Sequence, residues 1–263
     1  MNTVHATPAM PADARGASLL RLQAIETHHA LLQAWRIPAF SIPTLLFPLA
    51  FYALFGLLLP AQTGNAAPAH YLLATYGAFA VIGPALFGFG VGISIDEDMG
   101  WLRLKRVSPL PMAVHFIARV LTSMVFALAC VLALSALAAF AGDVVLSVPQ
   151  WLLLWTVLTL GAIPFCAMGL LVGSLVKARA SVAVVNLIYL PMSVISGLWF
   201  PITLFPEGVQ AFAHVLPAFH LGELALHVVG LREANVPLAL AMLLGSGALF
   251  LALALIVQRR RAR

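Results

Sequence analysis

Long runs of apolar residues dominate the hydropathy pattern of this chain, and the charged positions gather between them. Six runs approach or exceed the length of a membrane span, at about residues 38–59, 71–95, 115–141, 151–176, 180–202 and 236–257. A helix needs roughly 20 apolar residues to cross about 30 Å of hydrocarbon, and a helix satisfies its own backbone in lipid. The runs do not alternate as barrel strands do. The pattern therefore predicts an all-α membrane protein whose residues 38–257 form a domain of six transmembrane helices.

The composition agrees with this class. The chain is 62% hydrophobic and 9% charged, whereas soluble domains are about 45–50% apolar and about 25% charged. The first 37 residues lack the short apolar core and small-residue cleavage site of a secretory signal, so the first span is expected to serve as an uncleaved insertion signal. Residues 1–17 are rich in Ala and Pro and are expected to be disordered.

The basic residues lie almost entirely in alternate connections between the runs. Twelve of the 14 lie before the first run, after the second, after the fourth or after the sixth, Arg119 lies at the far edge of the loop after the second, and Arg232 is the exception. Because Lys and Arg favour the cytoplasmic side of short loops, this split predicts a multi-pass protein of the cell (inner) membrane with both termini cytoplasmic. Residues 258–263 then form a basic cytoplasmic tail, which we expect to contact anionic membrane lipid and no nucleic acid.

The connection after the second run, SIDEDMGWLRLKRVSPLPM from Ser94, holds acids first and bases last. This order complements a helix dipole, with Asp96 as the cap and Asp98 in the first turn. The bases of the last turn are Arg103, Lys105 and Arg106, and Pro109 and Pro111 end the helix.

The faces of this predicted cytoplasmic helix differ moderately in polarity. Trp101, Leu104 and Val107 share one face, and the opposite face carries Leu102 among the charged residues. Such a helix could lie on the membrane surface and present its charged face to a soluble partner. An ordinary solvated loop with basic residues explains the same pattern, and the residues alone leave both readings open.

A second amphipathic helix is predicted over residues 18–37. Leu20, Ala24, Leu31 and Trp35 fall at helical spacing on one stripe, whereas Glu26 and other polar residues lie away from it. This pattern indicates an interfacial helix that leads into the first span.

Within the spans, two G-x-x-x-G pairs, Gly88 with Gly92 and Gly169 with Gly173, predict close helix packing inside the bundle. The fifth span has a polar side made of Asn186, Tyr189, Ser193 and Ser196. These residues line a substrate path or bond to neighbouring helices, and the second reading is favoured. No acid or base is expected at mid-membrane depth, which argues against an ion-coupled carrier or channel.

The segment from Ser196 to Gly230 is cut by Pro206 and Pro217 into pieces too short to span. It predicts two short helices that re-enter or rest at the outer side between spans five and six. His220, Glu223 and His227 fall on one face there, so an intramembrane metalloenzyme is an alternative. A polar face without a metal is the favoured reading.

The chain lacks the phosphate-binding pattern G-x-x-x-x-G-K-[ST], since its two lysines follow Leu104 and Val176. It is therefore not expected to bind ATP in that way or to be an enzyme.

Together these features resemble the membrane subunit of ABC transporters of the type-2 exporter family. DEDMGWLRLKRVSPLP is similar to its cytoplasmic signature, with Asp98, Gly100 and Leu102 at the matching places. The segment from Ser196 to Gly230 is similar to its second signature, with Glu223 as the acid of the last helix.

The resemblance implies a permease without catalytic residues, paired with a second copy or a paralogue, that exports a drug, lipid, polysaccharide or other amphiphile. A separate cytoplasmic ATPase would bind the ATP and Mg. Its docking site would be a coupling helix formed by Asp98, Gly100, Trp101, Leu102, Arg103, Lys105 and Arg106. The helix with Leu20, Leu31 and Trp35 would be the connecting helix beside it.

Overall fold

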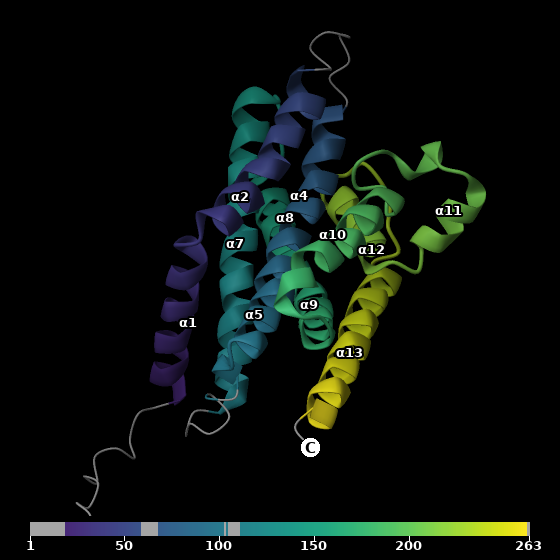
Figure 1. Cartoon of the computed structure of the whole chain (residues 1–263). Coiled ribbons are helices and arrows are strands. Elements are labelled where there is room, and N and C mark those ends of the chain that lie inside the picture. The colour runs from purple at the N-terminus through teal and green to yellow at the C-terminus, as the bar shows by residue number, and fades with distance from the viewer. Residues whose placement is uncertain (1–18, 59–67, 103, 105–110, 262–263) are drawn as a thin grey trace, which may run out of the picture.

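The computed structural model describes residues 19–58, 68–102, 104 and 111–261, and in this part of the chain every regular element is a helix (Figure 1). Among the described residues, six helices are long and apolar enough to cross a membrane: Phe40–Leu58, Ala69–Asp98, Met112–Ala141, Val148–Leu175, Ala178–Ile195 and Val236–Arg260. The predicted six-helix membrane architecture is therefore confirmed. The expected disorder of residues 1–17 lies outside the described residues.

Several of these long helices are built from more than one element. Helix α1 (Leu19–Trp35) precedes the first span, which is α2 (Pro38–Tyr52) with the π-helix η2 (Ala53–Leu58). The second span joins α4 (Pro68–Leu86), the π-helix η3 (Phe87–Val91) and α5 (Gly92–Asp98). The remaining spans are α7 (Met112–Ala141), α8 (Val148–Gly161) with α9 (Ile163–Leu175), α10 (Ala178–Ile195) and α13 (Val236–Arg261).

The second span is the centre of the bundle. In an apolar window of 18 residues, 72% of the second span is buried, whereas the corresponding share in the sixth span, Val236–Arg260, is only 11%. Helix α4 carries large apolar side chains on every side, and these pack against α2, α7, α9 and α12. A helix that is apolar all round and buried belongs in a core, whereas an equally apolar but exposed helix such as α13 suits lipid.

Close backbone contact fixes α9 against the π-turn η3. A Cβ atom added at Gly173 would lie 2.5 Å from the carbonyl oxygen of Gly90, and one at Gly169 would lie 3.0 Å from that of Ala85. Only glycine allows this approach. The predicted packing role of Gly169 and Gly173 within the bundle is confirmed.

The fourth and fifth spans differ from the prediction by more than a small shift of their ends. The fourth span is divided at Ala162, where α9 begins with Pro164 in its first turn. The fifth span ends at Ile195, short of the predicted residue 202, because Gly197 adopts a φ of 75° in the left-handed region. The hydropathy pattern does not register this turn, since the residues that follow are also apolar.

Two short α-helices follow α10, as predicted, and η4 (Ile202–Leu204) is a single 3₁₀ turn before them. Helix α11 (Glu207–Ala213) and helix α12 (Pro217–Val228) are the two predicted pieces. Helix α12 is largely buried and packs against α4, α8 and α13. Whether these helices re-enter the membrane stays a prediction.

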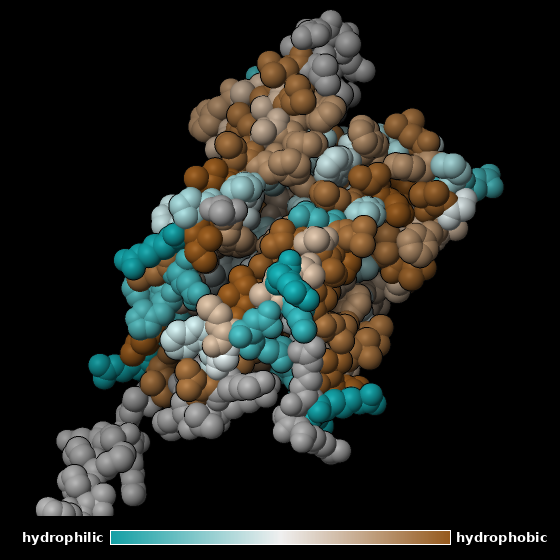
Figure 2. Space-filling model, in the orientation of Figure 1, coloured by the Kyte–Doolittle hydropathy of each residue, from teal (hydrophilic) through white to brown (hydrophobic). Residues whose placement is uncertain are grey.

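The surface has an uneven polarity. Figure 2 shows hydrophobic residues over most of the face drawn, whereas hydrophilic residues gather mainly toward its lower half, with a further group at the edge near α11. Figure 1 places α1 and the C-terminal end of α13 at that lower end of the molecule. A broad apolar surface with its hydrophilic residues concentrated toward one end is consistent with a protein embedded in lipid.

Candidate functional site

The predicted cytoplasmic helix is interrupted at Gly100. Helix α5 ends at Asp98, Gly100 has a φ of 77°, and the Gly100 N–H donates to the Glu97 carbonyl at 3.1 Å. A new helical turn then begins, in which the Leu104 N–H donates to the Gly100 carbonyl at 3.2 Å. The prediction of one helix capped by Asp96 is therefore wrong, because glycine in the left-handed region ends a helix at this point.

The turn after Gly100 buries Leu102 and exposes two residues of the predicted apolar face. Leu102 is only 3% exposed and belongs to the core, whereas Trp101 and Leu104 are 52% and 59% exposed. Trp101 and Leu104 therefore form an exposed apolar pair on a short turn, which we call the docking turn. Arg103, Lys105, Arg106 and Val107 lie outside the described residues.

Asp98 connects this region to the fifth span. Its Oδ2 atom accepts a hydrogen bond from the Ala178 backbone N–H at 2.8 Å. Ala178 is the first residue of α10, so the carboxylate satisfies a donor that the helix itself leaves without a partner. The end of the second span and the start of the fifth are thus held together beside the docking turn.

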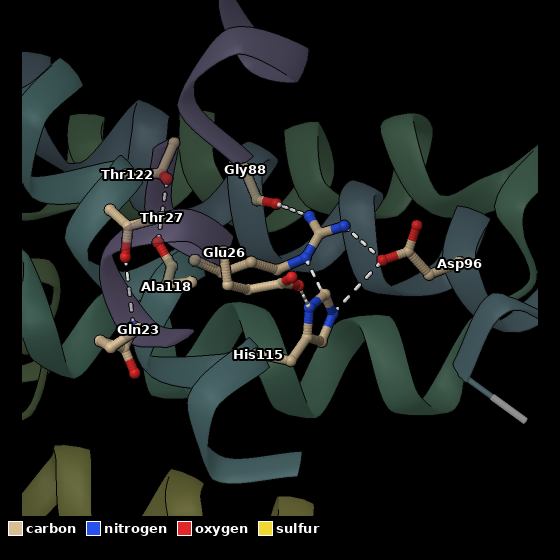
Figure 3. A network of polar contacts seen from close by, with 9 residues as sticks. Gln23, Glu26, Thr27, Gly88, Asp96, His115, Ala118 and Thr122 are labelled. Atoms are coloured by element: carbon tan, nitrogen blue, oxygen red, sulfur yellow. Dashed lines mark hydrogen bonds and ion pairs between the residues drawn. The ribbon is translucent and has the colours of Figure 1, made fainter. Parts of the chain in front are cut away.

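Asp96 does not cap a helix but lies buried in a charged network (Figure 3). It pairs with Arg119 Nη2, and its Oδ2 atom lies 3.5 Å from His115 Nε2. On the other side of the ring, His115 Nδ1 lies 2.9 Å from Glu26 Oε1. In Figure 3 the imidazole lies between the two carboxylates, so the network joins α1, α5 and α7. We call Glu26, Asp96, His115 and Arg119 the charged network.

The first glycine pair accommodates the arginine of this network. The Arg119 Nη1 atom donates to the Gly88 carbonyl at 3.1 Å. A Cβ atom at Gly92 would overlap that same Nη1 atom. The pair Gly88 and Gly92 therefore gives space to a side chain of α7, in addition to bringing helices close together.

Helix α1 packs against α7, and its partly buried face is mixed, with Glu26 and Thr27 beside Ala30 and Leu31. Leu20 and Trp35 of the predicted apolar stripe are exposed, and Leu31 is half-buried. Glu26, which was predicted to lie away from the stripe, reaches the buried His115 instead. The exposed part of the stripe can face lipid or a partner, although the Trp35 ring also lies 6.0 Å from that of Phe126 on α7, while the charged network fixes the helix to the bundle.

The sequence prediction missed His115, Arg119 and Glu26 as a group. His115 and Arg119 are four residues apart within an apolar run, so they share one helix face. An ionisable residue inside a membrane helix is generally taken to indicate a functional site. That spacing was the available signal, but Arg119 was assigned to the edge of the preceding loop.

A cavity of about 300 Å³ lies beside the charged network. Its walls come from α1, the start of the first span, the second span, α7 and Val182 of α10. Asp96 and Arg119 contribute its charged groups, and Thr122 and Ser123 add hydroxyls. The remaining lining is mainly Ala, Ile, Phe, Val, Gly and Pro, so the cavity is apolar with a polar side.

The predicted polar side of α10 is mostly engaged within the bundle. The Tyr189 hydroxyl donates to the Phe79 carbonyl at 3.0 Å, and Ser193 donates to the Tyr189 carbonyl at 2.7 Å. Asn186 is half-buried, and Ser196 lies at a small pocket near Tyr71 and Glu223. For Tyr189 and Ser193 these bonds agree with the favoured packing reading.

The three residues of the alternative metal site have separate partners. His220 Nε2 lies 2.8 Å from the His214 carbonyl oxygen, and Glu223 pairs with Arg232 at 2.5 Å. His227 Nδ1 lies 3.3 Å from the Arg232 carbonyl oxygen. Among the described residues no three His, Cys, Asp or Glu side chains are grouped as a metal site requires. The geometry gives the metalloenzyme alternative no support.

These features define a multi-pass membrane protein with a structured turn at one polar end of its helix bundle. The family model for ABC-2 type transporters matches residues 25–229, so the chain belongs to this family of transport permeases. The Bacillus subtilis (strain 168) protein YvfS, which is named as a transport permease, is 27% identical over 192 residues. That match covers 72% of this chain and 78% of YvfS. Membership makes the chain a transmembrane subunit of an ABC transporter, a class that works with an ABC ATPase.

Proposed function

We propose that this chain is the permease subunit of an ABC exporter. It pairs with a second copy or a paralogue, carries an amphiphilic substrate out of the cytoplasm, and is driven by a separate ATPase that binds ATP and Mg. Family membership supports the transport role, and the asymmetric distribution of basic residues supports an orientation with both termini in the cytoplasm of a cell (inner) membrane.

The docking turn is the observation that carries this proposal. Exposed aromatic and aliphatic side chains on a fixed turn suit a protein partner, since buried aromatic anchors dominate the energy of interfaces. Trp101 and Leu104 are such a pair, and the predicted docking bases Arg103, Lys105 and Arg106 are their neighbours in sequence. Gly100 sets the direction of the turn, and Leu102 anchors it in the core.

The turn is coupled to the spans through two connections. The Asp98–Ala178 hydrogen bond connects it to α10, and the charged network connects α5 to α1 and α7. When ATP binding brings the two ATPase subunits together, a displacement of the docking turn would therefore move α5 and α10 as a unit. Helix α1, with Leu20, Leu31 and Trp35, would act as the connecting helix beside the ATPase.

The test replaces Trp101 and Leu104 by Ala together. We expect the double variant to fold normally, because both side chains are exposed, but to lose co-purification of the ATPase and its stimulated ATP hydrolysis. A matched control is Leu187→Ala on α10, which is also exposed and lies in a span. Reversal of Arg103, Lys105 and Arg106 to Glu should produce the same loss. Full ATPase binding and stimulation in both sets of variants would refute the docking role.

A further inference from the structure

The cavity between α1, the second span and α7 has the properties of a binding site for a small molecule. Its volume of about 300 Å³ lies at the lower end of the range for ligand pockets, which are mostly apolar with a few convergent polar groups. Most of its lining is aliphatic or aromatic, and its polar groups include Asp96, Arg119, Thr122 and Ser123. A molecule that fits must therefore have an apolar body and a hydrogen-bonding end.

The charged network determines which polar end is acceptable. Arg119 is already compensated, because it pairs with Asp96 and donates to the Gly88 carbonyl. A second carboxylate, Glu26, lies on the far side of His115. Two acids thus face one arginine and one histidine, so the network carries no excess positive charge. An anionic head in the cavity would lose hydration beside the Asp96 carboxylate, and the one cation among the described lining residues, Arg119, is already paired.

We propose that this cavity binds a small amphiphile whose polar end is neutral or cationic. The site lies within one copy of the chain, between its own helices, so a partner permease is not needed to build it. The same chemistry could come from a transported substrate or from a lipid-like molecule of the surrounding membrane. The proposal does not depend on the docking role of Trp101 and Leu104.

Val182 offers a way to block the cavity without disturbing the core. It lines the cavity from α10 and is half-exposed, with 50% of its surface accessible. A Trp at this position can fill the space at the cavity edge. Leu187, on the same helix, is also exposed and apolar but does not line the cavity. Val182→Trp and Leu187→Trp therefore form a matched pair that adds the same side chain at two places.

The probes are two dyes with one ring system. N-phenyl-1-naphthylamine is neutral, and 1-anilinonaphthalene-8-sulfonate carries an added sulfonate. Each is titrated into the full-length protein in lipid nanodiscs, with empty nanodiscs subtracted, and both dye fluorescence and the melting temperature are recorded. We expect the neutral dye to show saturable binding and to raise the melting temperature, because a ligand that binds only the folded state stabilises it.

Val182→Trp should weaken this binding at least about tenfold, equivalent to about 1.4 kcal/mol, and Leu187→Trp should leave it unchanged. The sulfonated dye should bind at least about tenfold more weakly than the neutral dye. Any one of three results would overturn the proposal. The two Trp variants have equal effects, the neutral dye shows no saturable binding, or the sulfonated dye binds as tightly as the neutral dye or more tightly.

The two sources are distinguished in vesicles that also contain the ATPase. ATP-dependent movement of the neutral dye, lost in Val182→Trp, identifies the cavity as a substrate site. Saturable binding without movement identifies it as a site for a membrane amphiphile. Both outcomes support the cavity as a ligand site, and the binding measurement stands even if the transporter assignment fails.

Discussion

The Asp98 carboxylate accepts a hydrogen bond from the Ala178 backbone N–H, although the two residues are 80 positions apart. This bond fixes the start of α10 to the end of the second span, one turn before the docking turn. A carboxylate at a helix N-terminus is also favoured by the positive end of the helix dipole. The bond therefore connects the proposed ATPase contact directly to a membrane span.

Replacement of Asp98 separates this connecting role from a direct contact with the ATPase. Asp98→Ala removes the acceptor, and we expect ATPase binding to persist while stimulated ATP hydrolysis and transport fall. Asp98→Asn keeps an accepting oxygen and should retain most of the activity. For each variant, co-purification measures ATPase binding, and the rate of ATP hydrolysis measures stimulation. If Asn is as harmful as Ala and binding is lost in both, the charge serves ATPase docking instead.

The charged network is expected to be a main determinant of stability. Asp96 and Arg119 are both nearly buried, with side-chain exposures of 10% and 13%. Removing one member of a buried pair leaves an uncompensated charge and costs about 3–5 kcal/mol. Arg119→Met should therefore lower the unfolding temperature sharply, as should Asp96→Asn to a smaller degree.

The double variant Asp96→Asn with Arg119→Met supplies the control for this prediction. It leaves no unpaired charge between the two positions, so its destabilisation should be smaller than the sum of the single effects. Thermal unfolding in detergent, followed by tryptophan fluorescence, measures all three. Strictly additive effects would show that the two side chains do not interact in the folded protein.

The close contact between α9 and η3 predicts a strong effect of one added methyl group. A Cβ at Gly173 would lie 2.5 Å from the Gly90 carbonyl oxygen, and a backbone atom has little freedom to move. Gly173→Ala should cost about 1–3 kcal/mol, the usual range for overpacking. In Gly245→Ala on α13 the new atom meets nothing within 4 Å, so stability should stay the same or rise by up to about 1 kcal/mol. A similar melting temperature for both variants would contradict the packing argument.

Hydropathy predicted the six spans because the length and apolar character of a span are properties of local sequence. The break in the helix at Gly100 was missed because the φ of 77° at this residue does not affect the hydropathy pattern. The Glu26–His115 pair joins residues 89 positions apart, and no periodicity relates them. The stripe that contains Leu20 and Trp35 is apolar, as predicted. Lipid or a partner protein can cover such a stripe as well as the core of the bundle can. Helix α1 therefore packs inward through a mixed face that carries Glu26 beside Ala30 and Leu31.

The bonds of Tyr189 test whether the polar side of α10 serves packing or transport. Its ring stacks on Phe79 with centroids 4.8 Å apart, and its hydroxyl donates to the Phe79 carbonyl at 3.0 Å. Tyr189→Phe keeps the stacked rings and loses one hydrogen bond, so it should cost about 0.5–1.5 kcal/mol and leave the transport rate of the folded protein unchanged. Tyr189→Ala removes the ring as well and should cost about 3–5 kcal/mol, the range for large aromatic truncations. Melting temperature and transport in vesicles are measured for both, with Asn186→Ala as the half-buried control on the same helix. A Phe variant with normal stability and altered transport would instead place the Tyr189 hydroxyl on the substrate path, because only a contact with the moving molecule would then explain the change.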